Sequence, residues 1–287
     1  MTKRDIIYHC DCITGMSHIN TGVVDVIVTS PPYNIGKLYT TYDDTIPRNK
    51  YLTWMNNVAA SFFRVLSSYG SLYLNVGGSL KDPWIPMDVA MEFRKSGFIL
   101  QNMIHWIKSI ALPKEDMSKF YNTQISNNGI AVGHYKPINS HRYHNNCHEF
   151  IFHFTKTGDV PIDRLANGVP YQEKSNIHRW IKKKKEREKD IRDRGNTWFI
   201  PYETIHEGRP HPATFPIQLP IMCIRDHGID RCHLVMDPFM GIGSTALAAI
   251  QLGIPFVGFE IDEGYIQIAR ERIATELAKK TVGTRTS

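Results

Sequence analysis

A short polar turn follows the apolar segment 23–28 of this 287-residue chain. The turn reads Ser30-Pro31-Pro32-Tyr33. Its two prolines cannot donate to a sheet ladder, so a strand must end here. The Ser30 hydroxyl can donate and accept hydrogen bonds, and the Pro31 carbonyl can point outward because no local donor competes for it. With the Tyr33 ring as a stacking face, the turn suits the exocyclic amine of a flipped-out base.

A second candidate site lies in the segment "LVMDPFMGIGSTALAA" (234–249), whose pattern predicts a strand, a glycine turn and a helix. Gly241 and Gly243 allow a ligand to approach the backbone closely, and the following helix begins with unpaired N–H groups. Glu260 lies 19 residues after Gly241, at the end of the next predicted strand. A carboxylate at that place can accept hydrogen bonds from both ribose hydroxyls. The pattern predicts a nucleotide-cofactor site, with an ordinary tight turn of an α/β sheet as the alternative.

The spacing of the two turns favours one shared crevice. Ligands of open α/β sheets bind beyond the carboxyl ends of the strands, and both turns leave such an end. A proline-stiffened surface turn at Ser30 is therefore the weaker interpretation. Only 27 of the 287 residues follow Glu260, which leaves no room downstream for the second half of a dinucleotide fold. We therefore expect a single-nucleoside cofactor rather than NAD.

The elements that must position these turns alternate along the chain. Apolar runs predict strands at 5–12, 23–30, 70–76, 98–108, 149–156, 234–239 and 255–262. Apolar residues at helical spacing predict helices at 51–66, 86–97, 211–228, 243–253 and 264–280. Buried strands that alternate with helices predict an α/β fold with a doubly wound, mostly parallel, seven-stranded sheet.

The α/β pattern fails in the middle of the chain. The polar segment 108–146 is rich in Asn, Gly and Ser. We expect its last part, "GHYKPINSHRYHNN" (133–146), either to close over a flipped base or to pack against the sheet. A basic segment with isolated aromatic residues follows. We therefore divide the chain into a catalytic half (1–155), a small insert (156–209) and a cofactor half (210–287).

Positive charge is concentrated in the predicted insert. The chain carries a formal net charge of +6, and residues 174–194 contain ten Lys/Arg and four Asp/Glu. Such a window suits a polyanion such as nucleic acid, whereas a solvated helix with Lys–Glu pairs is the alternative. The candidate DNA-binding residues are Arg179, Lys182, Lys183, Lys184, Lys185, Arg192, Arg194 and Arg209.

Several classes of protein are not expected. No apolar run reaches the roughly 20 residues of a membrane span, and the N-terminus has no secretory signal pattern, so we expect a cytoplasmic location. Five cysteines, an odd number, do not indicate a disulfide framework. The spacing of Cys10 and Cys12 is wrong for a zinc knuckle, and no metal is expected.

These motifs resemble those of the DNA amino-methyltransferases that use S-adenosylmethionine, and the resemblance covers most of the chain. The segment "TSPPYN" (29–34) is similar to their catalytic motif and "DPFMGIGST" (237–245) to their cofactor motif. "FVGFEID" (256–262) is similar to the acidic strand end, and "HPATFP" (211–216) to the motif that closes on the methionine part of the cofactor. This order resembles the beta class, a circular permutation with its target-recognition region between the two halves.

The resemblance implies a role for each motif. Ser30, Pro31, Pro32 and Tyr33 would be catalytic, with the base stacked on the tyrosine. Asp11 would contact the adenine of the cofactor, although a carboxylate facing solvent is the alternative. The residues expected to bind the cofactor are Asp11, Thr29, His211, Thr214, Phe215, Asp237, Pro238, Phe239, Gly241, Gly243, Thr245 and Glu260.

The first residue of the catalytic motif bears on the target base. In the family, Ser at the place of Ser30 is common in enzymes that methylate cytosine N4, and Asp or Asn in those that methylate adenine N6. We therefore expect an N4-cytosine methyltransferase that acts on a flipped base in duplex DNA. The transfer would be direct, and the amine would lose its proton with or after it. No Pro-Cys dipeptide is present, which excludes the cysteine chemistry of cytosine C5 methylation.

Four other functions stay open: methylation of adenine N6, methylation of an RNA base, DNA binding by a degenerate enzyme, and NAD-dependent oxidoreduction. The resemblance also implies restriction-modification, with a cognate restriction endonuclease and a homodimer as candidate partners.

Overall fold

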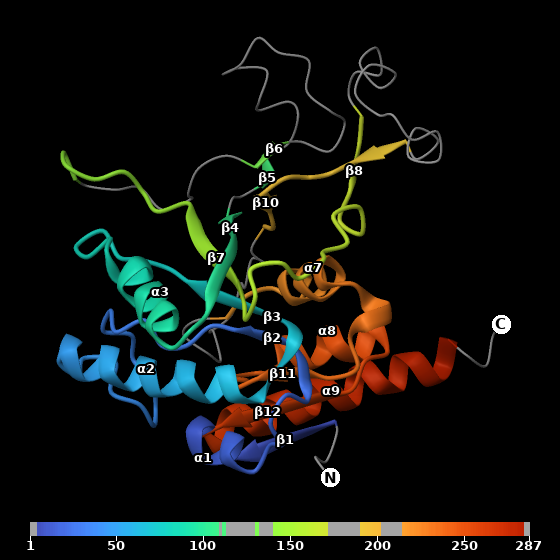
Figure 1. Ribbon diagram of the computed structural model, residues 1–287, viewed down its shortest axis with the longest axis horizontal. Coiled ribbons are helices and arrows are strands. Elements are labelled where there is room, and N and C mark those ends of the chain that lie inside the picture. Colours follow the sequence, from blue (N-terminus) through green and yellow to red (C-terminus); the bar gives the residue numbers. More distant parts are fainter. Residues whose placement is uncertain are drawn as a thin grey trace.

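Eight strands form the central sheet of the computed structural model, in the order β1-β12-β11-β2-β3-β7-β4-β10 (Figure 1). Neighbouring strands are parallel except at β7, which runs antiparallel to both β3 and β4. In chain order the strands are β1 (Ile6–His9), β2 (Val24–Thr29), β3 (Leu66–Val76), β4 (Ile99–Ile107), β7 (His148–Thr155), β10 (Thr197–Phe199), β11 (Val235–Asp237) and β12 (Phe256–Glu260).

Helices cover both faces of this sheet (Figure 1). One face packs against α1 (Cys12–Ser17), α2 (Arg48–Val65) and α3 (Ile85–Lys95). The other face packs against α7 (Gln218–His227), α8 (Ser244–Leu252) and α9 (Glu263–Gly283), and a short 3₁₀ turn, η1 (Ile229–Arg231), follows α7. Side chains of strand β2 alternate between the two faces. Val26 and Val28 belong to the hydrophobic core on the side of α7, α8 and α9, and Ile27 belongs to the core on the side of α1, α2 and α3. The predicted doubly wound, mostly parallel α/β fold is confirmed.

The structure describes residues 5–108, 111–112, 130–131, 140–171, 190–201 and 214–283. Two small sheets lie within these ranges, one of β5 (Ala111–Leu112) with β6 (Ile130–Ala131) and one of β8 (Val169–Pro170) with β9 (Ile191–Arg192). Most of the polar segment 108–146 lies outside the described residues. The same holds for the expected site residues Arg179, Lys182, Lys183, Lys184, Lys185, Arg209 and His211.

Two elements differ from the sequence expectation. The strand expected at 5–12 ends at His9, and helix α1 begins at Cys12, because the Asp11 side chain accepts hydrogen bonds from the Ile13 and Thr14 backbone N–H groups and caps the helix. The sheet has eight strands rather than seven, because β10, from the segment assigned to the insert, pairs with β4. Trp198 of β10 is buried in the core of the main sheet. The insert boundaries themselves stay a prediction.

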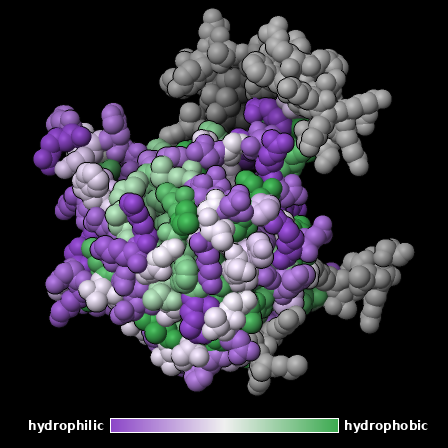
Figure 2. Space-filling model, viewed as in Figure 1, coloured by the Kyte–Doolittle hydropathy of each residue, from purple (hydrophilic) through white to green (hydrophobic). Residues whose placement is uncertain are grey.

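The surface mixes hydrophilic residues with small hydrophobic patches on the face seen in Figure 2. Within the described ranges, no helix combines the length and the apolar character that a membrane crossing needs. All five cysteines have free thiols.

A buried polar cluster joins β3 and β7 to α7 and so links the two halves of the chain. The Ser71 hydroxyl lies 3.0 Å from His153 Nε2 and 3.0 Å from His227 Nδ1. The Tyr73 ring stacks on His153, with ring centroids 4.5 Å apart. Burial lowers the pKa of His153 to about 3 and that of His227 to about 4. Both imidazoles are therefore neutral in the folded protein at neutral pH, so acidification costs stability.

We predict that His153→Gln weakens the pH dependence of folding. An unfolded histidine takes up a proton below about pH 6.5 and the folded His153 does not, so the native state loses stability as the pH falls from 7 to 5. Urea unfolding should show that the wild type loses about 2 kcal/mol more than the variant over this interval. Equal losses in the two proteins would contradict a neutral, buried His153.

Candidate active site

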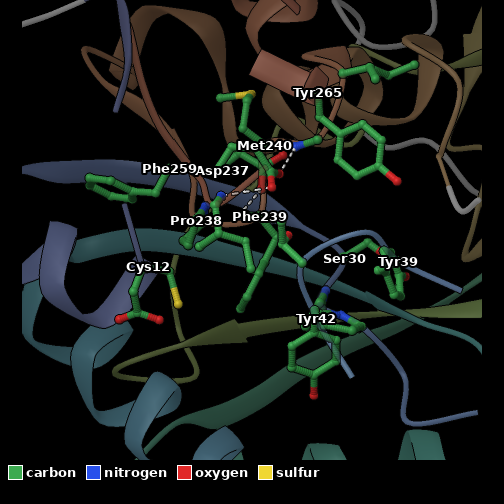
Figure 3. A pocket seen from close by; sticks show the side chains of 18 of the residues that line it. Cys12, Ser30, Tyr39, Tyr42, Asp237, Pro238, Phe239, Met240, Phe259 and Tyr265 are labelled. Carbon is green, nitrogen blue, oxygen red and sulfur yellow. Dashed lines mark hydrogen bonds between the residues drawn. The ribbon is translucent and has the colours of Figure 1, made fainter. Parts of the chain in front are cut away.

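One cleft lies over the carboxyl ends of β2, β11 and β12, and both sequence motifs contribute to it. Its lining includes Ser30, Pro31 and Pro32 from the first motif and the segment 237–242 from the second. Figure 3 shows Ser30, Asp237 and Phe239 in this cleft, together with Tyr39 and Tyr42. Strand β2 leads through α2 to one half of the sheet, and β11 leads through α8 to the other. The cleft is therefore at the place where the strand order reverses, where open α/β sheets bind ligands.

A buried carboxylate joins the two motifs directly. Asp237, at the end of β11, accepts hydrogen bonds from the hydroxyls of Thr29 and Thr245, each at 2.6 Å. The Phe239 backbone N–H donates to the same carboxylate at 3.0 Å. Burial raises the pKa of Asp237 to about 6. Thr29 ends β2 and Thr245 lies in the first turn of α8, so Asp237 fixes the serine-proline turn against the glycine turn.

Glu260 plays a comparable part at the other end of the glycine turn. Its Oε2 accepts from the Gly241 N–H at 2.7 Å, and its Oε1 accepts from the backbone N–H groups of Ile261 and Asp262. These bonds occupy three of the about four acceptor positions of a carboxylate. Glu260 also lines the cleft, and burial raises its pKa. One acceptor position thus remains for a ligand hydroxyl.

The glycine turn needs its glycines for backbone reasons. Gly241 has φ 52° and Gly243 has φ 85°, both in the left-handed region that other residues rarely adopt. A Cβ at Gly243 would also lie 3.1 Å from the Ala269 Cβ of α9. The absence of a side chain at Gly243 therefore also allows the start of α8 to pack closely against α9.

The other residues expected to bind the cofactor fall into two groups. Asp11, Thr214, Phe215, Pro238 and Phe239 line the cleft. Thr29 and Thr245 are fully buried behind this lining, where they bind Asp237.

The Tyr33 hydroxyl belongs to a hydrogen-bonded cluster that the sequence did not predict. Its phenol oxygen lies 2.7 Å from Ser30 Oγ, donates to Glu149 at 3.1 Å and accepts from the Asn75 amide at 2.6 Å. Burial, followed by the Glu149 charge, raises the pKa of the phenol well above its ordinary value. Lys108 pairs with Glu149 at the same place. Base stacking on Tyr33 stays a prediction.

Sequence reasoning missed Asn75, Lys108 and Glu149. Asn75 is near the end of β3, Lys108 follows β4, and Glu149 is near the start of β7. They meet because β7 is antiparallel to its neighbours, so its first residues share an edge with the last residues of β3 and β4. Their only sequence signal was their position at predicted strand ends.

Four aromatic residues of the cleft were also missed: Tyr39, Tyr42, Trp54 and Tyr265. The Trp54 ring lies 5.7 Å from the rings of both Tyr42 and Phe239. Tyr39 and Tyr42 follow the serine-proline turn in the loop before α2, where the sequence showed no regular pattern. The cleft therefore combines flat apolar walls with the carboxylates of Asp11 and Glu260.

Two expected DNA-binding residues are described. Arg192 is exposed, and its side chain donates to the Asp193 carbonyl at 3.3 Å. Arg194 donates to the Asn167 carbonyl at 3.0 Å, and burial lowers its pKa. The Asn167 side chain in turn donates to the Met222 carbonyl of α7. Arg194 is thus tied to the core, whereas Arg192 is the more accessible of the two.

Residues 24–271 match a family model of N6/N4 methyltransferases that is described as DNA methylase. The chain belongs to this DNA methylase family. The matched segment contains both motifs of the cleft and the whole insert. The resemblance inferred from the motifs is therefore confirmed.

Individual relatives of this DNA methylase are distant. Type II methyltransferase M.BglII of Bacillus subtilis is 28% identical over 279 residues, which cover 94% of this chain and 69% of that protein. The structure of PvuII DNA methyltransferase (cytosine-N4-specific) aligns with a TM-score of 0.62 at 17% identity, covering 96% and 92% of the two chains. TTHA0409 of Thermus thermophilus, solved in complex with S-adenosyl-L-methionine, aligns with a TM-score of 0.58 at 23% identity, covering 94% and 93%. At these identities the two structures show a shared fold.

We predict that Thr245→Val destabilises this DNA methylase. Valine keeps the shape of the side chain but removes the hydroxyl that donates to Asp237, so a buried carboxylate oxygen loses its partner. The free energy of unfolding should fall by about 1–3 kcal/mol. Thr53→Val is the matched control, because that hydroxyl lies on the exposed surface of α2 and bonds only to the Asn49 carbonyl. Similar small effects of both variants in urea unfolding would contradict the role given to Asp237.

Proposed function

We propose that this DNA methylase transfers a methyl group from S-adenosyl-L-methionine to the N4 amine of a flipped cytosine in duplex DNA. The observation that carries the proposal is the shared cleft, in which Ser30 and the glycine turn face one another across Asp237. The amine nitrogen would form a bond to the sulfonium methyl carbon of S-adenosylmethionine as the C–S bond breaks. S-adenosylhomocysteine would leave, and the amine would lose one proton to solvent with or after the transfer. The chain has to bring the amine and the donor together and exclude water.

The lining of the cleft fits such a donor. A nucleoside needs an acceptor for its ribose hydroxyls and flat apolar surfaces for its base. Glu260 offers the remaining acceptor position of a carboxylate that the backbone holds in place. Phe239 and Pro238 offer the apolar surfaces. The Asp11 carboxylate lines the same cleft and would contact polar atoms of the adenine. Thr214 and Phe215, which also line the cleft, would hold the methionine part.

The base enters from the side of the serine-proline turn. A cytosine must leave the duplex, at a cost of about a few kcal/mol. The Ser30 hydroxyl and the Pro31 carbonyl accept hydrogen bonds from its amine, which directs the nitrogen lone pair toward the methyl group. Tyr51 donates to the Pro32 carbonyl at 2.7 Å and so fixes the backbone of the turn.

The basic segment 174–194 binds the DNA backbone through its Lys/Arg residues, among them Arg192 on the described surface. The chain acts as the modification enzyme of a type II restriction-modification system, as the name of M.BglII suggests for that relative.

The second candidate function is methylation of adenine N6, which the family name also covers. Adenine and cytosine both present an exocyclic amine, so the same turn can hold either. Ser30 at the first motif position favours cytosine.

The test is to incubate the protein with labelled cofactor and duplex DNA and to analyse the product nucleosides. We expect N4-methylcytosine, and we expect Ser30→Ala to lower the turnover number by about 100-fold while calorimetry shows unchanged cofactor affinity. N6-methyladenine as the product would support the second candidate. Absence of methylated nucleosides from wild-type reactions, or full activity of Ser30→Ala, would contradict the proposal.

A further inference from the structure

The Tyr33 hydroxyl has used all of its hydrogen-bonding capacity. A phenol offers one donor and two acceptor positions. Its one proton goes to Glu149, because a carboxylate can only accept, and one acceptor position is taken by the Asn75 amide N–H. The remaining contact, with Ser30 Oγ at 2.7 Å, must therefore be donated by the serine. This assignment follows from counting donors and acceptors around one oxygen.

The direction of the hydrogen bond between Ser30 and Tyr33 decides whether Ser30 presents a proton or lone pairs to the cleft. A serine hydroxyl has one proton, and here the proton is committed to Tyr33. Ser30 Oγ therefore presents only lone pairs to a ligand, which is what an amine with two N–H bonds requires. We infer that Glu149 is a positioning residue for methyl transfer, which acts through Tyr33 to keep the Ser30 hydroxyl an acceptor. The inference rests on the proposed function, since it assumes that Ser30 receives an amine.

The neighbours of Glu149 hold its side chain in one orientation. Lys108 forms an ion pair with its Oε1, and both side chains are nearly buried, with 13% and 12% of their side-chain surface exposed. The Asn75 amide donates to Oε2, the oxygen that accepts from Tyr33. Gly77 leaves the space that the Glu149 side chain fills, because a Cβ there would lie 2.9 Å from three of its atoms. A charged group with this many partners does not reorient freely.

The substitution Glu149→Gln tests the direction of the chain of hydrogen bonds. An amide in the same place can donate to Tyr33, which frees the phenol proton to turn toward Ser30. The Ser30 proton can then point into the cleft, toward the amine whose N–H groups Ser30 Oγ should accept. We expect the turnover number to fall by about 10- to 100-fold, with unchanged affinity for S-adenosylmethionine. Tyr33→Phe removes the link altogether and should give a loss of similar size.

A double-mutant cycle separates this role from general damage to the fold. Once Ser30→Ala has removed the hydroxyl, its direction no longer matters, so adding Glu149→Gln should cost less than about 2-fold in turnover number. Glu92→Gln is the matched control, because Glu92 is also a nearly buried carboxylate paired with a lysine, Lys95, but lies on α3. It should leave the turnover number within about 2-fold of wild type.

The outcomes are distinguishable. If wild-type protein does not methylate DNA, the proposed function fails first. If wild type is active and Glu149→Gln is equally active, the inference is overturned. It is also overturned if the losses from Ser30→Ala and Glu149→Gln multiply in the double variant, because Glu149 would then act independently of the serine. Should Glu149→Gln melt well below wild type, the same cycle is run with Tyr33→Phe, and multiplying losses there overturn the inference as well.

Discussion

The geometry of the cleft depends on the Asp237 carboxylate and its two threonine partners. One buried side chain at the end of β11 binds Thr29 at the end of β2 and Thr245 in the helix after the glycine turn. These residues are 208 and 8 positions away from Asp237 in the sequence. A buried carboxylate is costly unless hydrogen-bonded, so its two hydroxyl partners fix the relative position of two turns that the chain order separates.

One consequence is that the two motifs, proposed above to bind the methyl donor and the target base, line one cleft. Parallel pairing of β2 with β11 places both strand ends at one edge of the sheet. On the β11 side, Glu260 holds Gly241 and keeps an acceptor position for a hydroxyl. On the β2 side, Tyr33 connects the serine to a charged pair that β4 and β7 supply. Hydrogen bonds from partly or fully buried side chains thus hold each of the two turns in place, and Asp237 fixes the position of one turn relative to the other.

The sequence was sufficient where the determinants are local. The prolines at 31 and 32, the glycines at 241 and 243, and the apolar runs of the strands predicted the fold class and both halves of the cleft. It was insufficient where a side chain depends on strand order. Glu149 gains its role only because β7 inserts antiparallel between β3 and β4, which no local pattern encodes. Short elements were missed for a related reason, since α1 depends on one cap and β10 has only three residues.

A crystal structure of the protein with S-adenosyl-L-homocysteine, the product form of the cofactor, tests the shared cleft most directly. In a shared cleft, a ribose hydroxyl should contact Glu260, the adenine should lie beside Phe239, and the thioether sulfur should face Ser30 and Pro31. Density for the ligand in another part of the molecule, or in this cleft with the sulfur directed away from Ser30, would contradict the account.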